Sequence, residues 1–305
     1  MKKTLSVAAL AVVMAGSAFA ADLPSYKAPP PPPPPPPPLW TGFYVGLNAG
    51  YTWTNSNSIN VVAAPGPCDP AAGNGCTLQP NYSVLSALAA SGVVSSNNSG
   101  FIGGGQIGYN WQFYNGAVLA GIEADIQGIA GSRQRGGFAS VIPSPNFPAF
   151  PQVSLTTASR ALDYIGTVRG RLGWLFTPTL LVYGTGGLAY GGVSLNYGVA
   201  QTCIGCAFTV APFAAASFSD TRVGWTAGGG FEWMFMPRWS AKVEYLYYDL
   251  SNVALNSAMI GTNAGNGPLF LSSFPQARTR FSGNIVRAGV NYHFNWGAPP
   301  VVAKY

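Results

Sequence analysis

Apolar and polar residues alternate with a period of two over most of the chain from Trp40 onward. In segment 42–51, Phe43, Val45 and Leu47 share one phase, whereas Gly and Asn dominate the other. The same alternation returns in seven further segments, 101–113, 118–127, 162–176, 179–191, 223–235, 239–247 and 281–294. A period of two is that of a β-strand, so the pattern predicts eight strands.

The connections between these segments fall into two classes that alternate strictly. Three are tight turns, at 114–116, 177–178 and 236–237. Four are long, at 54–99, 131–160, 198–220 and 252–279. Outer-membrane barrels keep short turns in the periplasm and long polar loops outside. The predicted fold is therefore all-β: a transmembrane eight-stranded antiparallel up-and-down β-barrel with long extracellular loops.

Composition supports a location in which the apolar face of the predicted strands contacts lipid. Only 8% of the residues are charged, against roughly a quarter in soluble domains. No run of about 18 apolar residues follows the N-terminus, so strands rather than helices would cross the membrane. A soluble barrel with its charged phase in water is the alternative.

The polar phase combines glycine with four acids and four bases. Glycine leaves room in a narrow lumen, where opposite charges pair to offset the cost of desolvation. We expect these lumen charges to be Glu123, Asp125, Arg169, Arg171, Glu232, Lys242, Glu244 and Arg287.

Aromatic residues gather on the apolar phase close to the tight turns. Trp and Tyr prefer the headgroup level of a bilayer. We expect an aromatic girdle made of Trp111, Phe113, Trp174, Phe176, Trp233, Phe235 and Trp239.

The termini predict export and a spacer. Residues 1–20 have the basic start, the short apolar run and the small-residue cleavage site of a signal peptide. Residues 21–39 contain ten consecutive prolines, which favour an extended polyproline II spacer over the alternative, a ligand for a proline-reading domain. The barrel is expected over 40–296 and a C-terminal periplasmic tail over 297–305.

Residues that suggest chemistry have simpler structural interpretations. Segment 103–108 matches a dinucleotide-binding fingerprint, but a predicted strand follows it where the fingerprint needs a helix. His293, the single histidine, has no acidic or serine partner nearby in sequence, so we expect no catalytic residue, cofactor or metal. The formal charge of +6 includes Lys2 and Lys3 of the signal peptide and forms no basic run, which argues against nucleic acid.

The four cysteines all lie in predicted loops. In an oxidising compartment, two local disulfides within Cys68, Cys76, Cys203 and Cys206 are expected, and a zinc site is the alternative.

Four segments carry a resemblance to a known family, namely 40–46, 104–110, 183–190 and 290–294. In order and spacing the chain resembles the alphaproteobacterial outer-membrane immunogenic proteins, which are RopB-like and often labelled porin-family proteins, within the wider group of OmpA-like barrels. The resemblance implies a surface antigen of the Gram-negative outer membrane. Tyr292 and Phe294 look like the signal that such barrels end on.

These observations predict a non-enzymatic surface barrel with a structural, envelope-integrity role and exposed antigenic loops. The expected partners are outer-membrane lipid and lipopolysaccharide, the outer-membrane assembly machinery, and peptidoglycan near the spacer. A narrow small-solute pore is one alternative. Haem capture by the outer loops is another, and it would need a tyrosine such as Tyr82. An envelope enzyme that uses His293 is the remaining one.

Overall fold

A computed structural model describes residues 40–66, 82–131, 133–144, 151–204, 212–263 and 269–294. All of them belong to one of the two compact units of the chain, residues 38–305. Within the described residues, no helix has the length and apolar character needed to cross a membrane.

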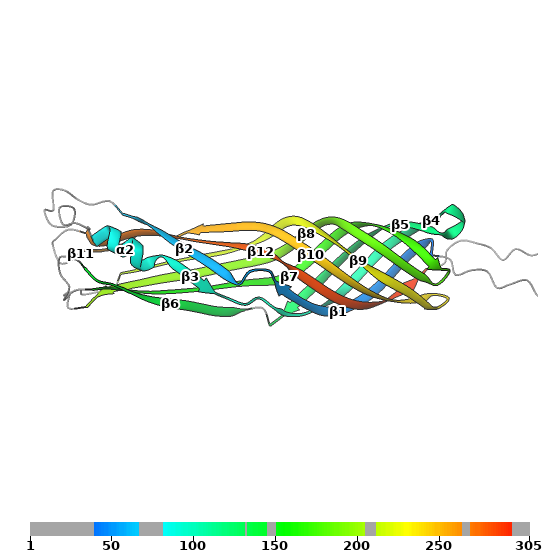
Figure 1. The fold of residues 1–305 in the computed structure, drawn as a ribbon, viewed down its shortest axis with the longest axis horizontal. Coiled ribbons are helices and arrows are strands. Elements are labelled where there is room, and N and C mark those ends of the chain that lie inside the picture. The colour runs from blue at the N-terminus through cyan, green and yellow to red at the C-terminus, as the bar shows by residue number, and fades with distance from the viewer. Residues whose placement is uncertain are drawn as a thin grey trace, which may run out of the picture. The chain divides into compact units, whose positions relative to one another are not determined.

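Eight antiparallel strands close into a barrel (Figure 1). Going around the ring, they are β1 (Gly42–Thr54), β4 (Gly100–Phe113), β5 (Val118–Ala130), β7 (Gln152–Thr177), β8 (Leu180–Cys203), β9 (Phe213–Met236), β10 (Trp239–Asn256) and β12 (Leu269–His293). The ring is closed because β1 pairs with both β4 and β12. The predicted eight-stranded barrel is confirmed, and so are its tight turns, the first of which contains a 3-10 turn at Tyr114–Gly116.

The prediction of four long loops is wrong for most of their length. β7 already begins at Gln152, and β8, β9 and β12 have 24, 24 and 25 residues, against 13 in β1. The same end carries four additional strands and one helix, which are β2 (Ser58–Pro65), β3 (Gly92–Ser95), β6 (Gln134–Ile142), β11 (Ile260–Asn263) and α2 (Tyr82–Ala90). We call these elements, together with residues 152–163, 191–203, 213–224, 248–256 and 269–283, the outer extension.

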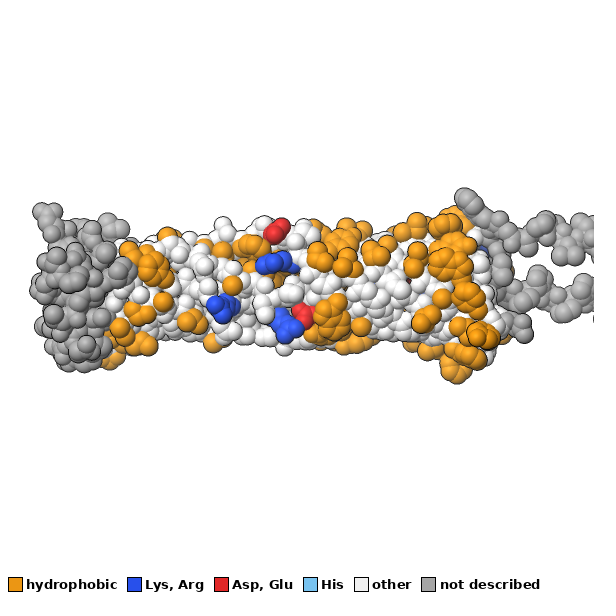
Figure 2. Space-filling view, turned by 90° about the horizontal axis from the view of Figure 1, so that it is seen from above, with side chains coloured by type: hydrophobic (Ala, Val, Ile, Leu, Met, Phe, Trp, Pro, Cys, Tyr) orange, Lys and Arg blue, Asp and Glu red, His pale blue; other side chains and the backbone are white. Residues whose placement is uncertain are grey.

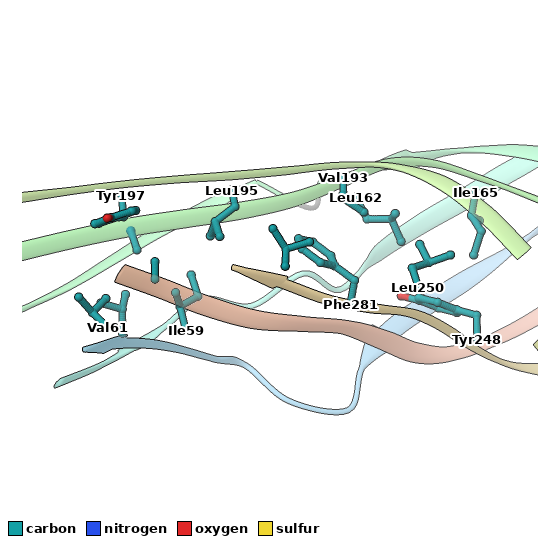
Figure 3. Close-up of a cluster of buried hydrophobic side chains, with 14 of the residues drawn as sticks. Ile59, Val61, Leu162, Ile165, Val193, Leu195, Tyr197, Tyr248, Leu250 and Phe281 are labelled. Carbon is teal, nitrogen blue, oxygen red and sulfur yellow. The ribbon is translucent and has the colours of Figure 1, made fainter. Parts of the chain in front are cut away.

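The sheet continues from the lower barrel into the outer extension, and there its two faces exchange polarity. Inside the extension, the inward positions of β8 are apolar, as Val193, Leu195 and Tyr197 show, and its outward positions include Asn196. Figure 3 shows this apolar core between the strands, including Ile59, Leu162, Leu250 and Phe281. An apolar interior with a polar exterior is the ordinary arrangement of a barrel surrounded by water, which indicates that this part stands outside the membrane.

Two β-bulges lie where the polarity changes. β7 shifts its register between Leu162 and Tyr164, and β10 shifts between Asp249 and Asn252. Ser251, at the second bulge, has a positive φ of 70°. An extra residue reverses the phase of a strand, which lets Leu250 and Val253 both point inward.

Helix α2 fills the interior of the outer extension, and seven of its side chains are buried. Ser86 on this helix donates a hydrogen bond to Gln201 Oε1 at 2.6 Å, and the same hydroxyl lies at hydrogen-bond distance, 2.9 Å, from Ser273 Oγ. The helix therefore joins β8 to β12 from within the barrel.

Exposed apolar residues form a band around the lower barrel. The seven aromatics predicted to form a girdle are all exposed and lie at the end with the tight turns. A second, upper girdle was not predicted, and it consists of Tyr51, Trp53, Phe101, Tyr164, Tyr190, Trp225 and Tyr247. Between the two girdles, no outward-facing residue that the structure describes is charged. Figure 2 shows charged side chains gathered beside this band instead.

Candidate functional site

The charged residues of the lower barrel lie inward on five strands. The strand register alone places acids beside bases, because Glu123 faces Arg169, Glu232 faces Lys242, and Glu244 faces Arg287. Each of the eight residues expected in the lumen is at most 5% exposed. We call these eight residues the lumen cluster.

Arg169 lies at the centre of the lumen cluster. Its guanidinium contacts three carboxylates, at 2.9 Å from Glu244, 2.5 Å from Glu123 and 2.9 Å from Asp125. Because these acids belong to β5 and β10, Arg169 on β7 ties strands together across the barrel.

Arg287 and Lys242 complete the central contacts. Arg287 lies 2.8 Å from Asp125 and 2.5 Å from Glu244. Lys242 donates a hydrogen bond of 2.8 Å to Glu123 Oε1. Glu123, Asp125 and Glu244 therefore each contact more than one base, and the four positive and four negative charges of the cluster balance.

Arg171 is held between two aromatic rings. Its guanidinium carbon is 4.9 Å from the ring centre of Tyr44 and 5.2 Å from that of Tyr183. Its Nη1 atom lies 3.0 Å from Glu232, and its Nε donates to Asn110 Oδ1 at 2.9 Å. Such cation–π contacts strengthen when water is excluded.

Polar residues that sequence reasoning missed support the lumen cluster. Tyr44 donates to Glu123 Oε2 at 2.6 Å, and Tyr183 donates to Glu244 Oε1 at 3.1 Å. Gly108 makes this possible, since a Cβ there would collide with the Tyr44 ring. The signal for Tyr44 was its place on the polar phase among Gly and Asn, where a large aromatic residue is unexpected.

Apolar layers close the lumen on both sides of the cluster. Towards the outer extension lie the buried side chains of Ile165, Leu246 and Ile285. At the end with the tight turns, Trp40 is completely buried against Leu119, Leu175, Leu181, Tyr183 and Met234. The Trp40 indole Nε1 donates to the carbonyl of Pro178 at 2.9 Å, and its ring packs edge-on against His293.

His293 has partners that the sequence spacing did not reveal. Its Nε2 atom is 2.9 Å from Ser240 Oγ and 3.5 Å from Glu232 Oε1. In a catalytic triad the acid orients the other ring nitrogen and the histidine accepts the serine proton. Here Ser240 donates instead to Glu232, at 2.5 Å, and all three side chains are buried beneath Trp40. With its hydroxyl proton directed to Glu232, Ser240 does not donate to His293 in this arrangement, and the three residues extend the polar contacts of the lumen cluster.

The remaining predicted residues are distributed as follows. The glycine motif 103–108 lies inside β4, a strand, as expected. Cys203 ends β8, whereas Cys68, Cys76 and Cys206 lie outside the described residues, so the disulfides stay predictions. Tyr292 packs against Phe294, whose amide donates to the carbonyl of Phe43 at 2.8 Å. Within the described ranges, no group of three or more His, Cys, Asp or Glu could hold a metal ion.

The sequence matches a family model and several known proteins. Residues 6–294 match the family model of the outer membrane protein beta-barrel domain. The 31 kDa outer-membrane immunogenic protein of Brucella melitensis is 34% identical over 298 residues, covering 96% of this chain and 100% of the relative. The 22 kDa outer membrane protein of Rhizobium leguminosarum is 30% identical over 148 residues, covering 48% of this chain and 52% of its own length.

Among solved structures, Ail, the attachment invasion locus protein of Yersinia pestis, aligns at 9% identity with a TM-score of 0.28, covering 83% of this chain and 99% of Ail. The family match over almost the whole chain, the near full-length relative and the closed ring of strands lead to one conclusion. The chain belongs to the outer-membrane β-barrel family, within its outer-membrane immunogenic proteins, and its location is the outer membrane of a Gram-negative cell.

Proposed function

We propose that the protein is a structural surface barrel that contributes to envelope integrity, presents the outer extension as an antigenic surface, and neither conducts solutes nor catalyses a reaction. The observation that carries this proposal is the obstruction of the lumen. The lumen cluster is enclosed by Trp40 on one side and by the apolar core of the outer extension on the other. An eight-stranded barrel has an interior that side chains can fill.

The obstruction has a physical basis that opposes transient opening. Every acid of the lumen cluster contacts at least one base at 3.0 Å or less. Removing one partner of such a buried pair leaves an uncompensated charge, which costs about 3–5 kcal/mol. An ion that entered the lumen would have to displace several of these contacts together.

Electrical recording tests the closed lumen. The refolded protein in a planar lipid bilayer should show no steady conductance, while a general porin recorded in the same bilayer serves as the positive control. Steady openings in the wild-type protein that change size in an Arg169→Ala variant would place the ion path through the lumen, and the proposal would be wrong.

A deletion strain tests the envelope role. Loss of the gene should increase leakage of a periplasmic enzyme and sensitivity to a large antibiotic that the outer membrane excludes, and the wild-type gene should restore both. An unchanged barrier in the deletion strain would contradict the role.

The alternatives receive less support from the geometry. Tyr82, the tyrosine considered as a haem ligand, is buried on α2. For partners, we propose that the end of β12 with Tyr292 and Phe294 is recognised by the outer-membrane assembly machinery. Peptidoglycan contact would involve the spacer, which lies outside the described residues.

A further inference from the structure

A groove of about 500 Å³ lies on the outward surface of the outer extension, across β6, β7, β8 and β9. Its floor is a single row of cross-strand neighbours, in which Arg135 faces Ser159, Ser159 faces Asn196, and Asn196 faces Ser217. Small hydroxyl and amide side chains therefore meet an arginine at one end of the groove.

The next row of the groove contains only small residues beside an aromatic wall. Thr157 faces Gly198, and Gly198 faces Ala215. A Cβ on Gly198 would lie 3.2 Å from the Phe213 ring, so the ring packs directly over this glycine. Phe213 is 64% exposed. Hydrogen-bonding groups, an apolar ring face and one cation together suit a sugar that carries an anionic group.

Below the groove, a charged collar follows the upper aromatic girdle. Its exposed members are Arg133, Arg135, Arg278, Arg280, Asp163 and Asp220, so exposed arginines outnumber exposed aspartates by four to two. Arg133 lies 3.2 Å from Asp163, the residue next to Tyr164 of the girdle, and its side chain is 71% exposed. Arg280 pairs with Asp249 and is 58% exposed. Figure 2 shows charged side chains close together on one face of the barrel.

The position of the collar and the groove relative to the membrane indicates which ligand they bind. The girdle marks the headgroup level, so the collar stands at the phosphates of the outer leaflet and the groove stands just above them. Exposed arginines bind phosphate through forked, charge-assisted hydrogen bonds. We propose that the collar and the groove together bind the phosphorylated sugar headgroup of lipopolysaccharide, with phosphates on the arginines and sugars in the groove. This inference rests on the outward orientation of the extension in the proposed function.

The collar is tested with the double variant Arg133→Gln and Arg280→Gln, after refolding into neutral detergent. Lipopolysaccharide affinity, measured by thermophoresis, should fall roughly 30-fold, since each arginine near an anionic surface contributes about fivefold and two are removed. The matched control is Arg238→Gln, which removes an exposed arginine at the opposite end of the barrel. Equal affinities of the double variant and the control would overturn the proposal, once both show the folded barrel's mobility on an unboiled gel.

The groove is tested separately with Asn196→Leu, which removes the central amide at similar volume. Binding of lipopolysaccharide that carries core sugars should weaken about fivefold, the effect of one lost hydrogen bond, whereas binding of lipid A alone should not change. Asn256→Leu, on the outward side of β10, is the control and should alter neither. An Asn196→Leu variant that binds core-bearing lipopolysaccharide as the wild type does would remove the groove from the site.

Vesicles of phosphatidylglycerol test whether the collar binds lipopolysaccharide specifically or binds any anionic lipid. The wild-type protein should prefer lipopolysaccharide to these vesicles, and equal binding of both would reduce the collar to general attraction for anionic lipid and contradict the proposal. A conducting barrel would contradict the closed-lumen function while leaving these binding results intact, so the two failures are distinguishable.

Discussion

At the scale of single residues, Glu123 connects more of the lumen cluster than its neighbours do. It contacts Arg169 and Lys242, and it accepts the hydroxyl of Tyr44. Buried ions lose their hydration, so the cluster is stable only while each charge keeps its partners. The consequence is that single changes should harm the barrel more than paired changes that keep it neutral.

We predict that Glu123→Gln lowers the free energy of unfolding by about 3–5 kcal/mol, because Lys242 and Arg169 are left with an excess positive charge. The double variant Glu123→Gln with Lys242→Met restores neutrality and should recover part of this loss. Urea unfolding in detergent micelles, followed by the mobility of unboiled protein, measures both. If the double variant lost as much free energy of unfolding as the two single variants together, or more, charge balance would not be the cause.

Trp40 gives the second prediction at this scale. Trp40→Ala removes a fully buried side chain and the hydrogen bond to Pro178, and it should cost about 3–5 kcal/mol. Trp239→Ala, at an exposed position of the lower girdle, is the control and should cost less. The same urea titration compares them, and similar losses in the two variants would mean that Trp40 does not seal the periplasmic end.

At the scale of elements, the strands are predictable from sequence only while one face keeps one chemistry. The lower barrel has apolar residues outward and polar residues inward, so period-two alternation identified its eight strands and their tight turns. The outer extension keeps the period but exchanges the faces, and bulges on β7 and β10 break the phase. The outer extension is rich in Ser, Asn, Gly and Ala, a composition typical of loops, and its strands were therefore predicted as loops.

The members of the lumen cluster were predictable from the sequence, but the contacts between residues of different strands were not. The eight lumen charges stand out because charged residues are rare in this chain, and they lie on the polar phase. The contacts of His293 with Ser240 and Glu232 required strand neighbours from β9, β10 and β12, which spacing along one strand does not reveal. The groove depends on the register of four strands and was hidden for the same reason.

The exchange of faces predicts opposite responses to one substitution. Leu172→Arg places a charge on the lipid-facing surface of β7 and should destabilise the barrel by about 2–4 kcal/mol. Ser219→Arg, outward on β9 in the outer extension, faces water and should change stability by less than about 0.5 kcal/mol. Unfolding in lipid vesicles measures both. Equal effects would place the membrane boundary elsewhere.

The β10 bulge predicts a pH dependence. Partial burial acts to raise the pKa of Asp249, but hydrogen bonds from Arg280 and from the Ser251 amide outweigh it and hold the pKa below its ordinary value. A carboxyl with a lowered folded-state pKa stabilises the fold above roughly pH 4 and loses this contribution as pH falls further. Asp249→Asn should therefore flatten the fall in the unfolding midpoint between pH 5 and pH 3. An unchanged slope would contradict the role of Asp249.

At the scale of the whole described barrel, side chains fill the interior from Trp40 to α2. Backbone pairing also continues through the outer extension, where β7 and β8 stay paired from Thr177 to Gln152, with register shifts between Leu175 and Thr177 and between Leu162 and Tyr164. The described strands of the outer extension are thus joined by backbone hydrogen bonds in the same way as those of the lower barrel.

This continuity predicts resistance to trypsin on intact cells. The tryptic sites Arg135, Arg278 and Arg280 are exposed but lie within paired strands, which must open locally before a protease can cut. Mass mapping of treated cells should find these bonds intact, and prior heating of the purified protein should expose them. Rapid cleavage at Arg278 in folded protein would show that the extension is not a stable sheet.

The exchange of faces also determines what an antibody meets on the cell surface. Along β8 it would touch Asn196 and Gly198 but not Leu195 or Tyr197, and beside them it would touch residues of β7 and β9. Epitopes on this surface are therefore assembled from alternate residues of neighbouring strands. A linear peptide copied from one strand would display the hidden residues as prominently as the visible ones, so vaccines against such a surface need the folded barrel.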